Sequence, residues 1–420
     1  MEIKLGLKEN LSQFWLLVFI NALVGGMIGL ERTLLPEIAE KEFHLSSTSI
    51  ALSFIIIFGL FKAATNYFAG VLANKFGRKK LLLFGWLIGI PVPFMLIYAN
   101  NWNWILFANV LLGINQGLTW SSTVLMKMDL VGEKQRGFAM GLNEFAGYGT
   151  LGLVAYTTSV IADNYGLRPY PFLIGIVIVI TGTLLTWLFV KDTSGHLKKD
   201  AELNNTIPLL KNTFTETSWL HKNLGSVTQA GLINNLNDAM IWGILPILLS
   251  QRGFGIGTIG IITAIYPIVW GLGQLITGKL SDIYCKKDLL FWGMFWQGLA
   301  ILLLFFSTTT FQYIAISIIL GIGTAIVYPT FLSGIAEDTN PQQRAKSIGV
   351  FRFWRDLGYV IGALLTGIMT DFFSIEFSII TIGLLTLLSA FIILYRMYCK
   401  PTLKRLSRLI KASAKPDTLK

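Results

Sequence analysis

The chain alternates between long apolar segments and short polar turns. Each apolar segment is close to the ~20 mainly apolar residues that cross a membrane as one helix. Twelve such segments are present, at 12–35, 47–70, 79–99, 103–126, 137–160, 170–190, 224–250, 256–277, 288–307, 311–334, 347–369 and 375–397. The pattern predicts an all-α membrane protein with twelve transmembrane helices.

One connection is longer and more polar than the others. It runs over 191–223 and contains KDTSGHLKKDAELNN. It divides the chain into two six-helix bundles, 1–190 and 224–399, and a basic tail follows at 400–420. The first ten residues, MEIKLGLKEN, are polar and the first apolar run is long enough to span, so no cleavable signal peptide is expected.

Composition narrows the class of protein. Of the 420 residues, 53% are hydrophobic and only 14% are charged, whereas soluble domains carry roughly 25% charged residues. Soluble enzymes, disordered scaffolds and secreted disulfide domains are therefore excluded. The two cysteines, Cys285 and Cys399, are too few for a disulfide framework.

The net charge of +11 would suggest a nucleic-acid partner in a soluble protein, so its distribution matters. With the N-terminus inside, the inside segments hold 27 of the 34 Lys and Arg residues and the outside loops hold 4. Because positive residues concentrate on the cytoplasmic side, we predict an N-in, C-in protein of the cell inner (plasma) membrane, with no nucleic-acid partner. Both cysteines then face the reducing cytosol or its edge. The tail is interpreted either as a basic helix on anionic membrane lipids or as a solvated extension.

The two halves repeat one another at a constant spacing. The stretch Gly70–Lys80, GVLANKFGRKK, recurs 208 residues later as Gly278–Asp288, GKLSDIYCKKD. An LGI tripeptide and the Gln-Arg pair that ends at Arg136 recur at the same offset, the latter ending at Arg344. Chance rarely keeps one offset over separated motifs, so the halves share an ancestor. Such repeats are typical of secondary transporters, whose binding sites lie near the bilayer midplane between the repeats.

The stretch from Gly70 to Lys80 resembles the loop signature G-x-L-a-D-r-x-G-r-k of the major facilitator superfamily. The resemblance covers the whole chain, with twelve spans, a long central connection and the signature after spans two and eight. The chain departs from the signature at Asn74, where the family usually has Asp, and at Cys285, which replaces the second Gly. The resemblance implies two pseudo-symmetric bundles and alternating access, and it points to the bacterial efflux-like branch.

The repeated signatures are interpreted as gates. Their short turns with glycine let two helices approach closely, and Gly25, Gly29 and Pro91 elsewhere favour close packing and kinks. A carboxylate such as Asp282 suits the positive N-terminal end of the fifth helix. The gating candidates are Gly70, Asn74, Gly77, Arg78, Arg136, Gly278, Asp282 and Arg344.

Ionisable residues within the spans are functional candidates, since each costs ~2.5–3.5 kcal/mol on insertion. Glu144 lies in the fifth span, and Arg352, Arg355 and Asp356 lie in the eleventh. Glu144 and Arg352 are equivalent at the 208-residue offset. Arg352 and Asp356, at i and i+4, are expected to pair, which leaves Arg355 to find an acid or an anionic substrate. These charges either form a fixed network between helices or serve coupling and substrate binding.

The seventh span is rich in amides. It contains Asn234, Asn235, Asn237 and Asp238, of which the first, third and fourth share a helix face. They either line the transport cavity, as the resemblance implies for the first helix of each half, or make hydrogen bonds between helices. Asp238 has no basic residue within a turn. The proton-coupling candidates are Glu144, Asp238, Asp356 and Glu31.

Residues of the other spans complete the set. Glu31 and Arg32, near the outer end of the first span, are interpreted as an interfacial anchor, and Lys62 as a snorkelling side chain. In the fourth and tenth spans, Gln116 and Trp120 correspond to Thr324 and Tyr328 at the repeat offset. The substrate-binding candidates are Asn234, Asn235, Asn237, Arg352, Arg355, Gln116, Trp120 and Tyr328.

Enzyme and metal motifs are missing. The stretch Gly273–Lys279 fits G-x-x-x-x-G-K, but Leu280 replaces the Mg²⁺-binding Ser or Thr and no strand precedes it. We expect no enzymatic activity, no cofactor and no metal. The sequence predicts a monomeric, proton-coupled secondary transporter that exports a small-molecule substrate. The alternatives are a proton symporter importing an organic anion or metabolite and, more remotely, a non-transporting receptor or scaffold.

Overall fold

The computed structural model describes residues 5–131, 136–203 and 208–399, apart from some side chains near helix ends. Within these ranges the regular secondary structure is helical, with no strand. In chain order the elements are α1 (Leu11–Arg32), α2 (Leu34–Lys41), α3 (Thr48–Ala51), α4 (Ser53–Phe76), α5 (Arg78–Gly89), α6 (Pro91–Tyr98), α7 (Trp102–Val131), α8 (Arg136–Tyr165), α9 (Tyr170–Phe189), α10 (Ser194–Leu203), α11 (Thr213–Thr215), the π-helix η2 (Glu216–Leu220), α12 (Lys222–Gln251), α13 (Ile256–Ile283), α14 (Lys286–Phe305), α15 (Thr310–Asp338), α16 (Pro341–Phe372) and α17 (Ile375–Arg396).

The predicted apolar segments are helices at the predicted places. Among the described residues, nine helical stretches are long and apolar enough to cross a membrane, and Ser53–Ala69 within α4 is a shorter apolar stretch. The helices α7 and α16 occupy two further predicted segments but are more polar. The all-helical membrane fold is confirmed, whereas twelve crossings stay a prediction.

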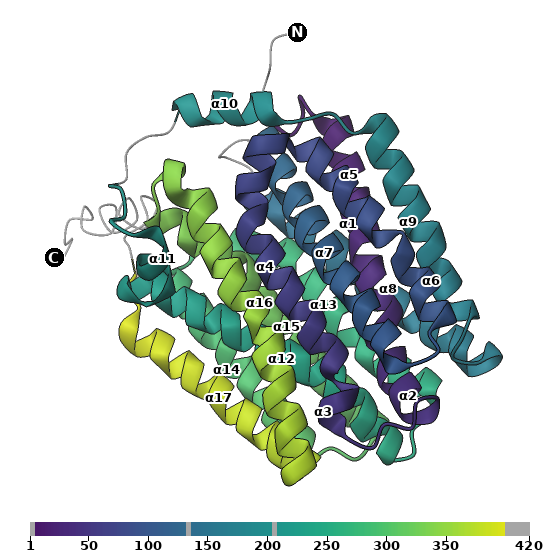
Figure 1. The fold of residues 1–420 in the computed structure, drawn as a ribbon. Helices are drawn as coiled ribbons and strands as arrows, with labels where there is room; N and C mark the ends of the chain where they lie inside the picture. Colours follow the sequence, from purple (N-terminus) through teal and green to yellow (C-terminus); the bar gives the residue numbers. More distant parts are fainter. Residues whose placement is uncertain (1–4, 132–135, 204–207, 400–420) are drawn as a thin grey trace, which may run out of the picture.

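The helices pack side by side into one bundle (Figure 1). The helix α10 lies across one end, and α2 and α3 lie at the other; we call these the α10 end and the α3 end. The helices α6 and α9 form one edge of the bundle, and α14 and α17 form the opposite edge. Large apolar side chains cover these edges, since Val177 and Leu388 are 65% and 55% exposed. Such an outer surface suits contact with lipid.

Two helix pairs make the most extensive contacts between the N-terminal half and the C-terminal half. The helix α8 packs against α13, and α4 packs against α16. A Cβ on Gly141 of α8 would lie 2.8 Å from the carbonyl oxygen of Gln274 in α13. Within the N-terminal half, a Cβ on Gly25 would lie only 1.9 Å from the carbonyl oxygen of Gly147 in α8. The close packing predicted for Gly25 is confirmed, because any side chain there would push α1 away from α8.

Helix starts recur at the predicted spacing. The helix α5 starts at Arg78 and α14 at Lys286, 208 residues later, and α7 and α15 start with the same offset. An ion pair recurs as well. Arg78 Nε lies 2.8 Å from Asp129 Oδ2, and Lys286 Nζ lies 3.4 Å from Glu337 Oε2, each partner again 208 residues apart. The repeat therefore extends from motifs to side-chain contacts.

Proline and the central connection shape the remaining elements. Pro91 begins α6 directly after α5, so the third predicted segment is a broken helix, as the kink prediction required. The polar connection over 191–223 contains α10, α11 and η2.

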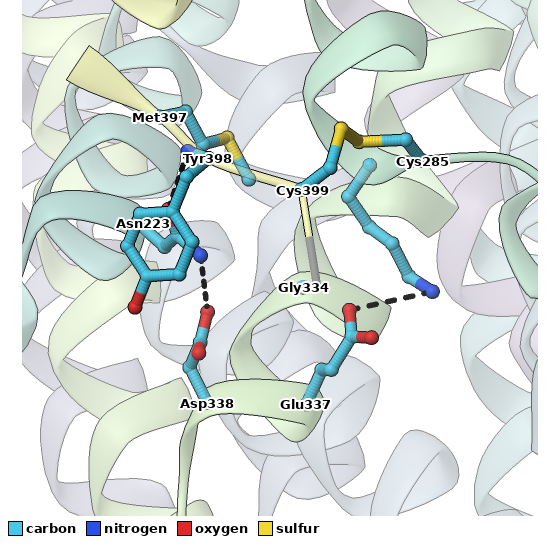
Figure 2. Close-up of a pocket in the computed structure, with 9 residues that line it drawn as sticks. Asn223, Cys285, Gly334, Glu337, Asp338, Met397, Tyr398 and Cys399 are labelled. Atoms are coloured by element: carbon cyan, nitrogen blue, oxygen red, sulfur yellow. Dashed lines mark hydrogen bonds and ion pairs between the residues drawn. A yellow bond between two sulfur atoms is a disulfide. The ribbon is translucent and has the colours of Figure 1, made fainter. Parts of the chain in front are cut away.

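The two cysteines are joined to each other. Cys285 precedes α14, Cys399 follows α17, and they form a disulfide with Cα atoms 5.7 Å apart (Figure 2). The sequence predicted no disulfide framework and did not predict this single bond, while the position of both residues beside the cytosol stays a prediction. The pairing depends on two segments 114 residues apart. Beside it, Asn223 accepts a hydrogen bond from the Tyr398 N–H at 3.1 Å and donates one to Asp338 at 3.1 Å.

Candidate functional site

Charged side chains are buried inside the bundle. Several of those within the predicted spans or next to them are at most 6% exposed: Glu31, Arg32, Lys62, Lys127, Glu144, Asp238, Arg352, Arg355 and Asp356. Taking an ion out of water costs several kcal/mol even after relaxation. A buried charge with protein partners on all its polar atoms stabilises the fold. A buried charge that lacks partners is available to bind a proton or a solute.

Asp356 of α16 has partners on both carboxylate oxygens. Its Oδ1 lies 2.9 Å from Arg355 Nη2 and accepts a hydrogen bond from Asn235 at 3.2 Å. Its Oδ2 accepts a hydrogen bond from Asn66 of α4, in the other half. The predicted pair of Asp356 with Arg352 is wrong. Adjacent residues point to different helix faces, but the long Arg355 side chain turns back to its neighbour.

Arg352 instead reaches the N-terminal half. Its Nη1 donates to Ser121 Oγ of α7 at 2.7 Å, and Ser121 donates to Asn66 Oδ1. Arg355 donates to the Tyr328 hydroxyl. One hydrogen-bonded network thus runs through the junction of the halves. Sequence reasoning missed Asn66 and Ser121, although an amide in the middle of an apolar segment was a signal for Asn66.

Glu144 of α8 is only partly satisfied. Its Oε1 accepts hydrogen bonds from Trp120 Nε1 at 3.2 Å and from Asn143 Nδ2 at 2.6 Å. Its buried Oε2 has no hydrogen-bond partner among the described residues. This oxygen is open to a proton or to a cationic partner without the loss of an existing contact.

The polar residues of α12 face two directions. The Oδ1 atom of Asp238 accepts a hydrogen bond from the Tyr266 hydroxyl of α13, and its Oδ2 has no partner in the described structure. Asn237 turns into the C-terminal half, where it donates to Gln297 at 3.1 Å and accepts from Thr386 at 2.7 Å. Asn237 and Asp238, which were predicted to share one helix face, therefore contact different helices.

Other amides predicted to bind substrate are engaged with the protein. The Nδ2 atom of Asn234 lies 3.5 Å from Asn235 Oδ1. Gln116 Nε2 donates to the carbonyl oxygen of Val24 at 3.0 Å, which joins α7 to α1. These contacts hold helices together in this arrangement, and substrate binding by the three amides stays a prediction.

Arg32 and Lys62 are buried in the protein. Each is 3% exposed, so the interfacial anchor predicted for Arg32 and the snorkelling predicted for Lys62 are wrong. Glu31 is also buried, with Oε2 accepting from Asn109 at 3.2 Å and Oε1 unpartnered among the described groups. Glu31 and Arg32 are buried because the chain does not leave the bundle after α1: α2 follows after a single residue, Thr33. The helical segment therefore continues beyond the predicted end of the first span.

Two cations and three aromatic side chains form a closed circuit of contacts, which we call the cation–aromatic ring. Arg32 Cζ lies 4.0 Å from the ring centroid of Trp242 and 5.0 Å from that of Phe58. Lys62 Nζ lies 5.3 Å from the Phe58 centroid and 5.2 Å from that of Tyr359. Trp242 and Tyr359 stack at 5.3 Å. The members come from α1, α4, α12 and α16, so the ring straddles the junction.

The ring leaves Arg32 unsatisfied. None of its three guanidinium nitrogens has a hydrogen-bond partner among the described residues. Each of its two cation–π contacts contributes ~0.5–2 kcal/mol, whereas each buried donor left without an acceptor costs ~1–3 kcal/mol. Burial of the charge adds several kcal/mol of further cost. A buried group in this condition requires an explanation beyond folding.

Comparison with known families identifies the architecture. The sequence model of the Major Facilitator Superfamily matches residues 14–224 and 227–418. The chain belongs to this superfamily. The proton-coupled antiporter flippase LtaA of Staphylococcus epidermidis is 26% identical over 385 residues, which cover 87% of this chain and 88% of LtaA. The multidrug resistance protein MdtG of Salmonella arizonae is 25% identical, over 87% of this chain and 89% of MdtG.

Solved structures share the fold. A POT family transporter in complex with a thioalcohol-conjugated peptide superposes with a TM-score of 0.73 at 12% identity, over 91% of this chain and 95% of that one. The human organic anion transporter MFSD10 (TETRAN) gives 0.68 at 15% identity, over 91% and 99%. The match to the sequence model confirms the superfamily resemblance read from the loop signature.

The first loop signature of this superfamily member is tied to its own half. Gly77 has a φ of +87°, which favours glycine, and a Cβ there would lie 3.0 Å from Asp192 Oδ2. Asp192 accepts a hydrogen bond from the Lys79 N–H at 3.0 Å. Burial raises the pKa of Asp192, but hydrogen bonds from Ser194 and Lys79 outweigh it and lower the pKa overall. The turn between α4 and α5 is therefore held by the segment after α9.

The other gating candidates divide into two sets. Arg78 forms the buried ion pair with Asp129, which also accepts from Thr193 at 2.8 Å. Gly278 is buried in α13, and its carbonyl oxygen accepts from Ser281 at 2.8 Å. The remaining candidates lie in helices, but their surroundings are outside what the structure describes: Gly70, Asn74, Arg136, Asp282 and Arg344.

At the α3 end, Asp371 of α16 links the two halves. Its carboxylate accepts hydrogen bonds from Ser47 Oγ at 2.8 Å, the Thr48 N–H at 2.7 Å and the Ser49 N–H at 3.1 Å. Burial raises the pKa of Asp371, but these hydrogen bonds outweigh it and lower the pKa overall. Sequence reasoning missed this contact, because the partners are more than 320 positions apart in the sequence.

One cluster of possible metal ligands occurs among the described residues. The ligand atoms of Cys285, Asp288 and Cys399 lie within 4.8 Å of one another. Both sulfur atoms belong to the disulfide and offer no thiolate in this state.

Proposed function

We propose that this chain is a proton-coupled secondary transporter that exports a small solute by alternating access. It would cross the cell inner membrane twelve times, with both termini inside. The observation that carries the proposal is the hydrogen-bonded network of charged residues at the junction of the halves. Such buried charges are expensive inside a membrane and mark transport pathways.

The network suits a two-state mechanism. The hydrogen bonds from Arg352 to Ser121 and from Asn66 to Asp356 cross between the halves. Rocking of one half against the other would break them and expose their charges to water. A proton or a solute that compensates the exposed charges would then shift the balance between the two states.

Proton exchange is best assigned to Glu144. One of its carboxylate oxygens already has two donors and the other has none, so protonation needs no contact to be broken. Asp238 is the second candidate for the same reason, and Glu31 the third. Asp356 is placed last, because both of its oxygens are engaged.

The relatives support export as the direction of transport. An antiporter flippase and a multidrug resistance protein both match over most of the chain. Import of an anion held by Arg352 or Arg355 is less favoured, since both side chains already have protein partners.

The test measures proton flux in proteoliposomes with a trapped pH-sensitive dye. A thermal-shift screen over drugs and metabolites first supplies a solute that stabilises the purified protein. Glu144→Gln keeps the hydrogen-bonding shape of the protonated acid, so the variant should fold and bind that solute but lose solute-driven proton flux. The control Glu40→Gln changes an exposed glutamate and should behave as wild type.

Two outcomes contradict the proposal. Wild-type proton flux in Glu144→Gln would remove Glu144 as the obligatory carrier. Absence of any solute flux in the wild-type protein would favour a receptor or scaffold. The topology has its own test, since a reporter active only in the periplasm and fused after Lys420 should give no signal.

A further inference from the structure

The cation–aromatic ring contains two cations that face the same aromatic side chain. Arg32 of α1 and Lys62 of α4 both lie within 5.3 Å of the Phe58 centroid. Lys62 also lies 5.8 Å from the Trp120 ring. Two like charges repel one another in a buried site, so their convergence requires a compensating negative charge.

Neither cation has an anion in this arrangement. Among the described residues, no carboxylate oxygen lies within 4.0 Å of Arg32 or Lys62, and the three guanidinium nitrogens of Arg32 are unpaired. The other buried cations differ. Arg352 donates to Ser121, Lys127 to the Leu17 carbonyl oxygen, and Arg355 to Asp356.

The acids nearest Arg32 make no salt bridge with it among the described residues. Glu31 accepts a hydrogen bond from Asn109 through Oε2. Asp238 holds Tyr266 through Oδ1. The donors of Arg32 therefore remain for a group that the protein does not supply.

We propose that Arg32 and Lys62 bind the anionic group of an amphipathic organic anion whose flat apolar body packs against Phe58, Trp242 and Tyr359. This inference rests on the proposed transport function and names its substrate class. The planar guanidinium fits a carboxylate, sulfonate or phosphate with two parallel hydrogen bonds. Aromatic side chains supply the large, rigid contact area that a flat apolar group needs.

The origin of the groups gives the site a role in transport. Both cations come from the N-terminal half, whereas Trp242 and Tyr359 come from the C-terminal half. An anion held at the ring touches both halves, so it would stabilise the state in which they meet and leave when they separate. Binding of a solute of this class would therefore shift the balance between the state in which the halves meet here and the state in which they are apart.

The experiment compares three probes that share one ring system and differ in charge. These are 2-naphthalenesulfonate, 2-naphthol and 2-naphthylmethylammonium, titrated into the purified full-length protein with tryptophan fluorescence and calorimetry as readouts. We expect the sulfonate to bind at least ten-fold more tightly than the other two. Arg32→Gln and Lys62→Met should each weaken sulfonate binding at least ten-fold.

A matched control separates this site from cation–π contacts in general. Lys75, also on α4, lies 5.5 Å from the Phe76 ring, but it is exposed. Lys75→Met should leave sulfonate affinity unchanged. Because Arg32 has no hydrogen bond to lose, Arg32→Gln should unfold at the same temperature as wild type or higher.

The outcomes distinguish an anion-binding site from a cluster that only stabilises the fold. Equal affinity for the three probes, or an equal loss in Lys75→Met, overturns the proposal. A lower unfolding temperature in Arg32→Gln together with unchanged sulfonate affinity would assign the ring to stability and also overturn it. Sulfonate binding without proton flux would contradict the transport function alone, whereas proton-coupled flux of another solute without sulfonate binding would contradict this inference alone.

Discussion

Each half has an ion pair at the equivalent place, but the two pairs differ in length and burial. In the N-terminal half the Arg78–Asp129 pair is 2.8 Å long, with both side chains at most 6% exposed. In the C-terminal half the equivalent Lys286–Glu337 pair is 3.4 Å long, with side chains 13% and 30% exposed. The repeat therefore preserved the position of the contact, while its geometry and burial diverged.

The same divergence affects the segment that follows the last helix of each half. After α9, Asp192 binds the turn at Gly77 through hydrogen bonds. After α17, Cys399 binds the equivalent turn at Cys285 through the disulfide (Figure 2). Gly77 and Cys285 are 208 residues apart, so one structural need is met by polar contacts in one half and by a covalent bond in the other.

In the middle of the molecule the halves are complementary. Lys62 and Glu144 of the N-terminal half correspond to Trp270 and Arg352 of the C-terminal half. Tyr148 corresponds in the same way to Asp356, and it stacks on Trp270 at 3.5 Å. Charged residues of one half thus correspond to aromatic or oppositely charged residues at the equivalent positions of the other half.

The largest effect should come from Asp356. Asp356→Ala leaves Arg355 buried without its carboxylate, and loss of one partner of a buried pair costs about 3–5 kcal/mol. The equivalent change in the other half, Tyr148→Phe, removes a single hydroxyl and should cost about 1 kcal/mol or less. Thermal unfolding in one detergent measures both. Similar losses for the two would contradict the division between a charged network and an aromatic stack.

The two equivalent ion pairs should respond unequally. Arg78→Met breaks the buried pair and should cost about 3 kcal/mol, whereas Lys286→Met breaks a partly exposed pair and should cost about 1 kcal/mol or less. Chemical denaturation monitored by tryptophan fluorescence compares the two variants. A larger loss in Lys286→Met would reverse the assignment of the stronger contact.

Removal of the disulfide should weaken only the C-terminal half. Cys285→Ser should lower stability by about 2 kcal/mol, since a bond across a long loop restricts the unfolded chain. Proteolysis should then cut near residue 399 sooner, while the segment at Asp192 keeps its protection. Titration of free thiols before and after reduction shows whether the bond is present. Two free thiols in the untreated protein would contradict the structure at this point.

The smallest effect concerns the α3 end. Asp371 has a lowered pKa, so its contact with Ser47, Thr48 and Ser49 is present above the ordinary carboxyl pKa and is lost as pH falls through the lowered one. Asp371→Asn should therefore remove ~0.2–1 kcal/mol at neutral pH and nothing in strong acid. The equivalent Asp163 accepts no hydrogen bond from the described residues, so Asp163→Asn is the control. Unfolding temperatures at both pH values give the comparison, and equal shifts in the two variants would contradict it.

Much of the fold was predictable because its causes are local or periodic. Apolar runs must be helical in lipid, where every backbone group needs an internal partner. Gly25 predicted close packing of its helix, and the repeated motifs predicted the paired helix starts. Buried charges such as Glu144 and Asp356 were also visible, since any ionisable residue in a span attracts attention.

The sequence by itself determined the all-helical membrane architecture, the internal repeat and the set of unusual charges. Which charges pair was decided only by the tertiary structure. Arg355 rather than Arg352 meets Asp356, because Arg352 is engaged with Ser121 of α7 and α4 brings Asn66 to the other carboxylate oxygen. Arg32 of α1 and Lys62 of α4 both face Phe58, because the packed bundle brings the end of α1 next to this residue of α4. The burial of a side chain and its hydrogen-bond partners depend on how the helices pack, so they cannot be inferred from any single segment.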